Sequence, residues 1–173
     1  MNDTAAVKLP EAASDGFEKI RHPARKHFLS RGWPTRRNEA YKYTDLSALA
    51  RREWPRPDKP GDTASLPNAL GTRVLWTDGF LANEPENLPW LHSLRTCAAQ
   101  PAAELTALLG RLTPEDDPIV ALNTALFDHG TWIRLDRDDT PDDPIELTYA
   151  SGKRDEAAAT HARLALDLEN GAS

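Results

Sequence analysis

The chain has 173 residues, enough for one domain or a small domain with an appendage, and its 39% hydrophobic content and five tryptophans exclude a wholly disordered protein. Charge is unevenly spread. Residues 1–56 hold 12 Lys and Arg against 7 Asp and Glu, a net +5, whereas residues 57–173 hold 9 against 20, a net −11. A basic head on an acidic body suits docking against itself or a partner better than general nucleic-acid binding, which the acidic part would oppose.

Cysteine usage and hydropathy bear on the compartment. Cys97 is the single cysteine, so an internal disulfide or a site of clustered Cys ligands is excluded, and a reducing compartment is favoured. No apolar run approaches the roughly twenty residues of a membrane span, and Met1–Thr4 lacks the basic and apolar regions of a signal peptide. We therefore expect a cytoplasmic protein without a membrane partner.

The first regular element is expected after a loose arm over residues 1–14. Apolar residues at helical spacing predict an amphipathic helix over residues 17–30, with Phe17, Ile20 and Phe28 buried. Pro23 lies inside this pattern. Because proline removes a helical hydrogen bond and clashes with the preceding turn, it predicts a kink or two abutting helices.

Residues 31–46, the aromatic–basic corner, are unusually rich in large rings and positive charge. Its rings are Trp33, Tyr41 and Tyr43, and its central basic residues are Arg36, Arg37 and Lys42. Since rings of this size are stabilised against a packed wall, we expect a helix-turn-helix corner docked on the rest of the domain. A nucleic-acid patch is the alternative, because aromatic rings stack on bases and basic groups neutralise phosphates.

A short helix and a linker are expected next. Thr44 can cap a helix that ends near Arg52 and turns Leu46 and Leu49 inward. Residues 54–68 then contain four prolines and little apolar content, which indicates a linker or a surface loop.

The middle of the chain predicts a hairpin and two helices. Residues 74–76 and 80–81 flank Asp78-Gly79, a pair that favours a tight hairpin turn. Pro101 can start a helix whose buried stripe is Leu105, Leu108, Leu109 and Leu112. Capping residues precede prolines in 113–116 and again at Asp117-Pro118, where a helix burying Ile119, Leu122 and Leu126 is expected to close at Gly130.

From Thr131 the hydrophobic period changes to two residues. Three strands are predicted, separated by polar connections at 138–143 and 151–160, and their apolar positions are Ile133 and Leu135, then Ile145, Leu147 and Tyr149, then Leu164, Leu166 and Leu168.

The patterns of common catalytic sites are missing or incomplete. No Gly-x-x-x-x-Gly-Lys loop occurs, so ATP hydrolysis and a nucleotide site are not expected, and the histidines at 22, 27, 92, 129 and 161 lack zinc spacing. His22 and His27 are read as surface or packing residues. Asp128-His129 could belong to a hydrolase triad, but no nucleophile elbow accompanies it, and a turn capping the 119–127 helix is favoured.

Two further candidates have simple alternatives. The acidic residues at 138, 139, 142 and 143 lack the Gly and the final Glu of a calcium loop, so a solvated hairpin connection is the better interpretation. Cys97 beside Arg95 is either a thiol of lowered pKa that binds sulfur or metal, or a residue without a functional role. No catalytic, cofactor-binding or metal residue is assigned, and we do not expect an enzyme.

Two segments resemble a known family. The run Pro-Thr-Arg-Arg-Asn-Glu-Ala-Tyr-Lys-Tyr-Thr-Asp-Leu at 34–46 resembles the N-terminal signature of SufD proteins, in the SufB/SufD family of scaffold subunits of the SUF iron-sulfur cluster assembly complex. The segment 117–127, Gly130, Ile133, Pro144-Ile145 and 161–163 resemble later landmarks of that family in its order. Tyr41 stands where Trp is commoner and Ala162 where Pro is common, and neither departure changes the interpretation.

The resemblance implies an α+β chain, with a helical N-terminal domain followed by the first strands of a right-handed parallel β-helix, truncated. The expected division is a helical head over 1–54, a Pro-rich linker over 55–70, a mixed hairpin and helices over 71–130, and the start of the β-helix over 131–173. A strand left at the end of such a stack is expected to self-associate through residues 161–168, or to fray.

The functional implication is a non-catalytic scaffold part. In the family, SufD pairs with SufB through the β-helices, each binds the SufC ATPase through its C-terminal region, and the iron-sulfur cluster and flavin are associated with the full complex. No cofactor is expected in this chain, because the segments that carry those roles would lie beyond it. The alternative is a self-contained protein- or RNA-binding adaptor module with a basic aromatic head.

Overall fold

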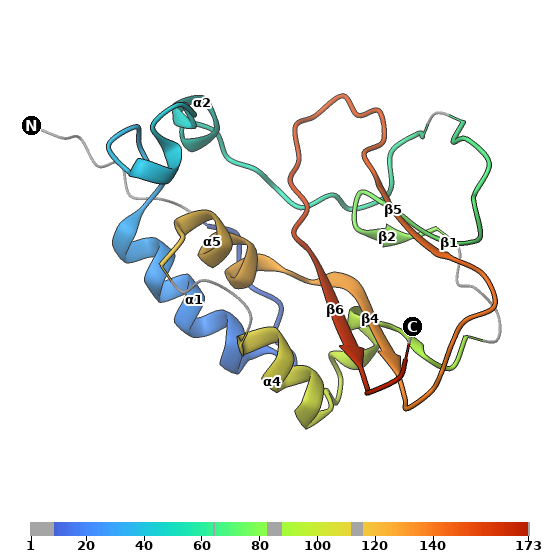
Figure 1. The fold of residues 1–173 in the computed structure, drawn as a ribbon. Helices are drawn as coiled ribbons and strands as arrows, with labels where there is room; N and C mark the ends of the chain where they lie inside the picture. Colours follow the sequence, from blue (N-terminus) through green and yellow to red (C-terminus); the bar gives the residue numbers. More distant parts are fainter. Residues whose placement is uncertain (1–8, 64, 83–87, 112–115, 173) are drawn as a thin grey trace, which may run out of the picture.

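The computed structural model describes residues 9–63, 65–82, 88–111 and 116–172, and the fold of these residues is mixed α+β. Most of the helices gather at one end and the strands at the other (Figure 1). The helices are α1 (Glu18–Arg31), α2 (Ser47–Ala50), α3 (Leu94–Cys97), α4 (Ala103–Arg111) and α5 (Pro118–Leu126), with a short 3-10 turn η1 (Glu39–Tyr41). The strands are β1 (Thr72–Thr77), β2 (Phe80–Leu81), β3 (Leu91–Ser93), β4 (His129–Leu135), β5 (Ile145–Ala150) and β6 (Ala162–Leu168).

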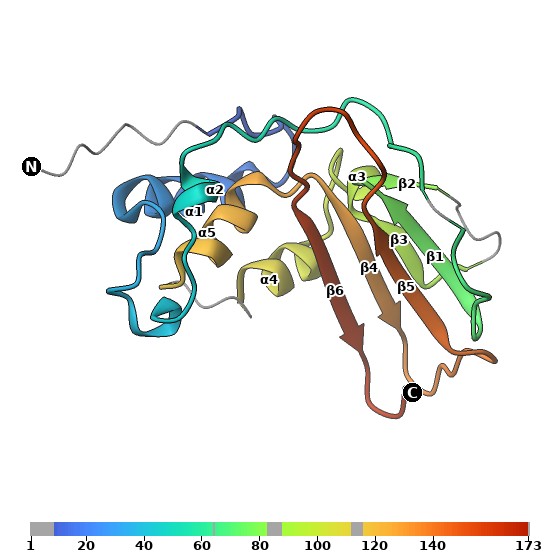
Figure 2. The same cartoon turned by 90° about the horizontal axis from the view of Figure 1, so that it is seen from above.

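The described strands form two three-stranded sheets, ordered β2-β1-β5 and β3-β4-β6. The pairings β1–β5 and β4–β6 are parallel, whereas the hairpin pairing β1–β2 and the pairing β3–β4 are antiparallel. The consecutive strands β4, β5 and β6 therefore alternate between the two sheets, as Figure 2 shows from above. The three predicted C-terminal strands are confirmed, but a β-helix is not.

The two faces of strand β4 pack against different layers. Trp132 and its register partner Ala165 face the helices and share a core cluster with Phe17 of the α1 start and Leu105 of α4. The opposite face meets the other sheet, because the Trp76 indole donates a hydrogen bond to Thr131 Oγ1 at 3.0 Å. One sheet thus separates a helix-facing core from an inter-sheet core.

Helix α1 is the longest described helix and packs along α5. The predicted burial of Phe17 and Phe28 is confirmed, and Ile20 is partly buried. Of the two outcomes predicted at Pro23, a kink or two abutting helices, the second is excluded, because α1 continues through that residue. Packing of Phe28 into a second cluster with Leu122, Leu126 and Trp33 compensates for the hydrogen bond that proline cannot make.

Arg21 is the most buried charged side chain of the described residues, at 2% exposed. Its Nε donates to the Phe127 carbonyl at 2.8 Å, and its terminal nitrogen binds Asp15. The guanidinium carbon lies 4.6 Å from the centre of the Phe127 ring and 5.6 Å from that of Phe17. Arg21 therefore fixes α1 to the point where α5 passes into β4.

The hairpin turn agrees with the sequence pattern. Asp78 and Gly79 both have positive φ, 48° and 86°, and Thr77 pairs with Phe80 across the turn. The predicted cap of α5 is also confirmed, because the Asp117 carboxylate accepts from the backbone N–H groups of Ile119 and Val120.

Several predicted boundaries are wrong. Helix α5 ends at Leu126 rather than Gly130, which lies inside β4, where a Cβ would approach the Arg163 carbonyl oxygen to 1.9 Å. That close approach of two strands explains the glycine. Helix α4 starts at Ala103 rather than Pro101, with Leu105 and Leu109 buried as predicted. Leu112 and the capping residues 113–115 lie outside the described residues.

The short helix after the corner also differs from its prediction. Helix α2 begins at Ser47, whose N–H is bound by the Asp45 carboxylate at 2.9 Å, so Thr44 is not its cap. Leu46 is half-buried, but Leu49 is exposed rather than turned inward. Four residues make too short a helix to bury a full apolar stripe.

Strand β6 presents a half-exposed row of leucines. Leu164, Leu166 and Leu168, the leucine row, are 46%, 49% and 53% exposed, whereas Ala165 between them is buried against the helices. In register they share the face of Thr131, Ile133 and Leu135 of β4, all buried between the sheets. β6 is an edge strand of its sheet among the described residues. The leucine row therefore extends the face that packs between the two sheets, but the other sheet covers that face fully only at β4.

We expect Arg21→Met to lower the free energy of unfolding by roughly 3–5 kcal/mol, because it leaves Asp15 and the Phe127 carbonyl without their buried partner. Urea denaturation measures it. Lys26→Met, an exposed change on the same helix, is the control and should alter the midpoint little. Equal stability of both variants would show that the buried guanidinium is dispensable.

The 173-residue chain is expected to self-associate through β6, or to leave residues 161–168 frayed, because an exposed edge with an apolar face recruits other strands. Light scattering across a hundredfold dilution and hydrogen exchange at 161–168 measure the two outcomes. Leu166→Lys should reduce association, while Leu70→Lys, at an 89% exposed position elsewhere, should not. A monodisperse monomer with a fully protected β6 contradicts the prediction.

Candidate functional site

A compact group of charged side chains lies where the linker, α5, β4 and the loop before β6 meet. The group comprises Arg56, Arg95, Asp128, His129 and His161, and we call it the Asp128 cluster. Asp128 is its centre: its carboxylate lies 2.8 Å from His129 Nδ1, 3.1 Å from Arg56 and 3.8 Å from Arg95. Arg56 also donates to the Leu126 carbonyl at 2.7 Å, so the cluster ties the linker to the end of α5.

The pKa values of Asp128 and His161 are both lowered in the cluster, but for different reasons. Burial raises the pKa of Asp128, but the hydrogen bond with His129 and the charge of Arg56 outweigh it, so the pKa lies below its usual value. Burial, with repulsion from Arg56, lowers the pKa of His161 to about 4 despite the opposing effect of Asp128. At neutral pH the cluster thus holds an ionised carboxylate between arginines and a neutral His161.

The imidazole ring of His129 is enclosed by its neighbours. Its ring lies 5.6 Å from the Trp76 ring, and a Cβ on Gly79 would come within 2.8 Å of it. The prediction that Asp128-His129 forms a turn capping α5 is wrong, because Phe127 is the C-cap and His129 already belongs to β4. The neighbours of the pair are arginines and a second histidine.

A second carboxylate joins the hairpin to two distant loops. Asp78 accepts from the Gly61 N–H at 2.8 Å and the Gly152 N–H at 3.2 Å, and it pairs with Arg154. Burial opposes ionisation, yet these backbone donors and Arg154 bring the pKa of Asp78 below its usual value. Together with an isolated antiparallel β-bridge, in which the Lys153 N–H donates to the Asp62 carbonyl at 2.7 Å, this fixes the linker against the connection from β5 to β6.

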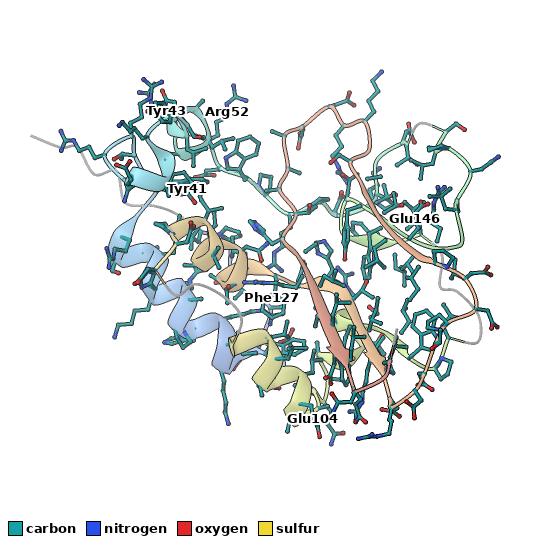
Figure 3. The ribbon with its side chains drawn as sticks, in the orientation of Figure 1. Tyr41, Tyr43, Arg52, Glu104, Phe127 and Glu146 are labelled. Atoms are coloured by element: carbon teal, nitrogen blue, oxygen red, sulfur yellow. The ribbon has the colours of Figure 1, made fainter. Side chains whose placement is uncertain are left out.

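The aromatic–basic corner divides into an anchored side and a free side. Tyr41 donates to the Asp117 carboxylate at 2.8 Å, and Trp33 packs edge-on against Phe28 with centroids 5.7 Å apart. Tyr43 is 91% exposed, with Lys42 above its ring. The prediction that all three rings pack on a wall is therefore wrong for Tyr43; Figure 3 shows it at the outer end of the corner, beyond Tyr41.

The remaining sequence candidates are separated in the fold. Cys97 is partly buried in α3, and burial raises the pKa of its thiol, so a thiol activated by Arg95 is not supported. Arg95 instead lies over the Phe80 ring and near Asp128. His22 is exposed and His27 half-buried, both on α1, and the acidic residues of 138–143 lie in the exposed connection between β4 and β5.

Metal-binding groups and membrane spans were also sought in the described residues. Among these residues no group of three or more His, Cys, Asp and Glu side chains is arranged to hold a metal ion. None of the described helices has both the length and the apolar character that crossing a bilayer requires.

Comparison with known proteins adds one finding. Residues 3–59 match a family model described as SufBD protein N-terminal region. This supports the SufB/SufD family for the N-terminal region. The matched residues include the whole aromatic–basic corner, whereas the resemblance at 117–130 and beyond lies outside them. The model covers both SufB and SufD, so it does not separate the two, and no curated protein matched the chain.

The two tyrosines of the corner should respond differently to substitution. Tyr41→Phe removes a hydrogen bond to the charged cap of α5 and should cost roughly 1.5–3 kcal/mol of stability. Tyr43→Ala should change the unfolding midpoint little, because its ring is solvent-exposed. Thermal denaturation of both variants and the parent measures these changes in stability. A large loss of stability in Tyr43→Ala would show that the Tyr43 ring is packed.

Stability should fall as the pH drops from 6.5 toward 4. The pKa of His161 is about 4 in the folded state and 6.5 in the unfolded chain. The unfolded chain therefore binds more protons than the folded chain between these two pH values. Between pH 7.5 and 5.5 the loss should be about 1 kcal/mol. His161→Gln should flatten this part of the profile, measured by urea midpoints at several pH values. An unchanged slope in the variant would assign the dependence to other groups.

Proposed function

We propose that the chain is a non-catalytic scaffold component, the N-terminal part of a SufD-type subunit of the SUF iron-sulfur cluster assembly complex. The observation that carries the proposal is the match of residues 3–59 to the SufB/SufD N-terminal family model, centred on the aromatic–basic corner. The resemblance of residues 34–46 to the SufD signature is the reason for proposing SufD rather than SufB, and the downstream segments at 117–127 and 161–163 resemble later landmarks in the same order.

Strand connectivity is consistent with this proposal. We interpret β4 and β5 as one coil of the parallel β-helix that the family implies and β6 as the start of the next coil, because β6 returns beside β4 in parallel after the chain has crossed to the other sheet. The parallel pairing of β5 with β1 is the equivalent contact in the second sheet. The leucine row would then be the inner face of a further coil.

The proposed role is structural rather than catalytic. The carboxylates of Asp128 and Asp78 are held by arginines and backbone N–H groups from distant segments, which suits fixing loops. We place the protein in the cytoplasm with SufB-like and SufC-like subunits as partners. Iron and sulfide are the cargo of the assembled complex, and ATP is hydrolysed by the SufC subunit in this proposal.

The test is co-expression with SufB and SufC followed by affinity purification of the tagged chain at low and high salt. The proposal expects recovery of a SUF subunit and no co-purifying nucleic acid. The chain alone should hydrolyse no ATP and carry no cluster. Failure to recover either subunit, or stoichiometric iron and sulfide that survive gel filtration of the chain alone, would contradict it.

A second candidate is a protein- or RNA-binding adaptor, which the exposure of Tyr43 among basic residues favours. The same purification separates the two functions. An adaptor for RNA would retain nucleic acid at low salt and release it at high salt, and Tyr43→Ala would weaken that retention.

A further inference from the structure

A cavity of about 560 Å³ lies beside the aromatic–basic corner, and we call it the corner cavity. Its walls come from the N-terminal arm, Trp33 of the corner, residues 49–54 in and after α2, helix α5 and the loop before β6. The apolar lining includes Trp33, Trp54, Leu49, Leu122 and Leu126. Its volume falls within the range of roughly 300–1,000 Å³ typical of ligand sites, whose walls are also mainly apolar and aromatic.

Hydrogen bonds hold the walls of this cavity in place. The Trp54 indole donates to the Leu49 carbonyl at 2.8 Å, and the Ala159 N–H donates to the Pro55 carbonyl at 3.0 Å. Arg25 fixes the arm by donating to the Pro10 carbonyl at 2.7 Å and to the Leu9 carbonyl at 3.1 Å. The cavity is therefore built by contacts between segments, so its shape persists without a ligand.

The rim of the corner cavity is basic. Arg51 and Arg52 line it and are exposed, and Figure 3 shows Arg52 at the helical end of the molecule. Glu53 is the acidic residue among the lining side chains, and His161 on the inner wall is neutral at pH 7. An apolar hollow edged by arginines is complementary to a ligand that combines one bulky apolar group with negative charge.

We propose that the corner cavity binds a short acidic segment of a partner protein, which inserts one bulky apolar side chain between Trp33 and Trp54. Carboxylates that flank this side chain pair with Arg51 and Arg52 at the rim. A protein segment fits better than nucleic acid, because the mainly apolar interior matches one bulky apolar side chain, whereas the charge of the rim does not distinguish carboxylates from phosphates. The proposal does not depend on the SUF assignment.

The probe is a synthetic peptide with a central phenylalanine flanked by glutamates, titrated into the full ¹⁵N-labelled chain. We expect the indole N–H signals of Trp33 and Trp54 to shift on binding, and those of Trp76 and Trp132 to stay. Two control peptides carry serine in place of phenylalanine, or lysines in place of glutamates. Both should bind at least about tenfold more weakly, since each removes one half of the complementarity.

Matched variants distinguish the cavity from other surfaces. Leu49→Glu lines the cavity and should weaken binding about tenfold or more, whereas Leu29→Glu, on α1 and similarly exposed at 47% against 41%, should change it less than about twofold. Arg52→Glu should likewise weaken binding more than Arg37→Glu, which does not line the cavity. Thermal denaturation of each variant confirms that it is folded.

Three outcomes would overturn the proposal: no indole shift at millimolar peptide, equal binding by Leu49→Glu and Leu29→Glu, or displacement of the peptide by a single-stranded oligonucleotide that binds more tightly at the same rim. Peptide binding by a chain that recovers neither SufB nor SufC would support the cavity and contradict the scaffold role alone. Recovery of SufB or SufC by the Leu49→Glu variant would show that the corner cavity is not the site at which those subunits bind.

Discussion

The arrangement of the helical side depends on how the buried guanidinium of Arg21 is neutralised. Removing an arginine from water costs several kcal/mol unless charge and hydrogen bonds replace the lost hydration. Here Asp15 supplies the charge, the Phe127 carbonyl accepts a hydrogen bond, and the rings of Phe17 and Phe127 supply the apolar surface. Because these partners come from the turn before α1 and the end of α5, only one register of the two helices satisfies them all.

Phe127 passes this constraint on to the sheets. It ends α5, packs in the helix-facing core beside Trp132, and lies centrally between helices and strands (Figure 3). The next residue, Asp128, binds Arg56 of the linker. One short stretch of chain therefore holds α1 on one side and the linker on the other, and the preceding residue, Leu126, lines the corner cavity.

Local chemistry was sufficient to predict the elements that need only neighbours in sequence. The Asp78-Gly79 turn and the Asp117 cap are examples, because positive φ and the first-turn N–H groups involve residues at most three apart. The site depends on distant partners. Nothing near Arg21 in the sequence predicts its hydrogen bond to a carbonyl 106 positions away. The alternation of leucine with other residues in β6 likewise does not predict that Ala165 faces the core while the leucine row is half exposed.

The two tyrosines of the corner have different environments, although they are only two residues apart in the sequence. Tyr41 is positioned by its hydrogen bond to Asp117, 76 positions away in the sequence. Tyr43, two residues later, lies beyond this contact and is exposed to solvent. The anchoring has a consequence for binding. A corner fixed by Tyr41 and Trp33 presents Tyr43 on an anchored backbone, so binding there would have a smaller entropy cost of ordering that segment to offset. Structural and binding interpretations of the motif therefore apply to different residues of it and do not compete.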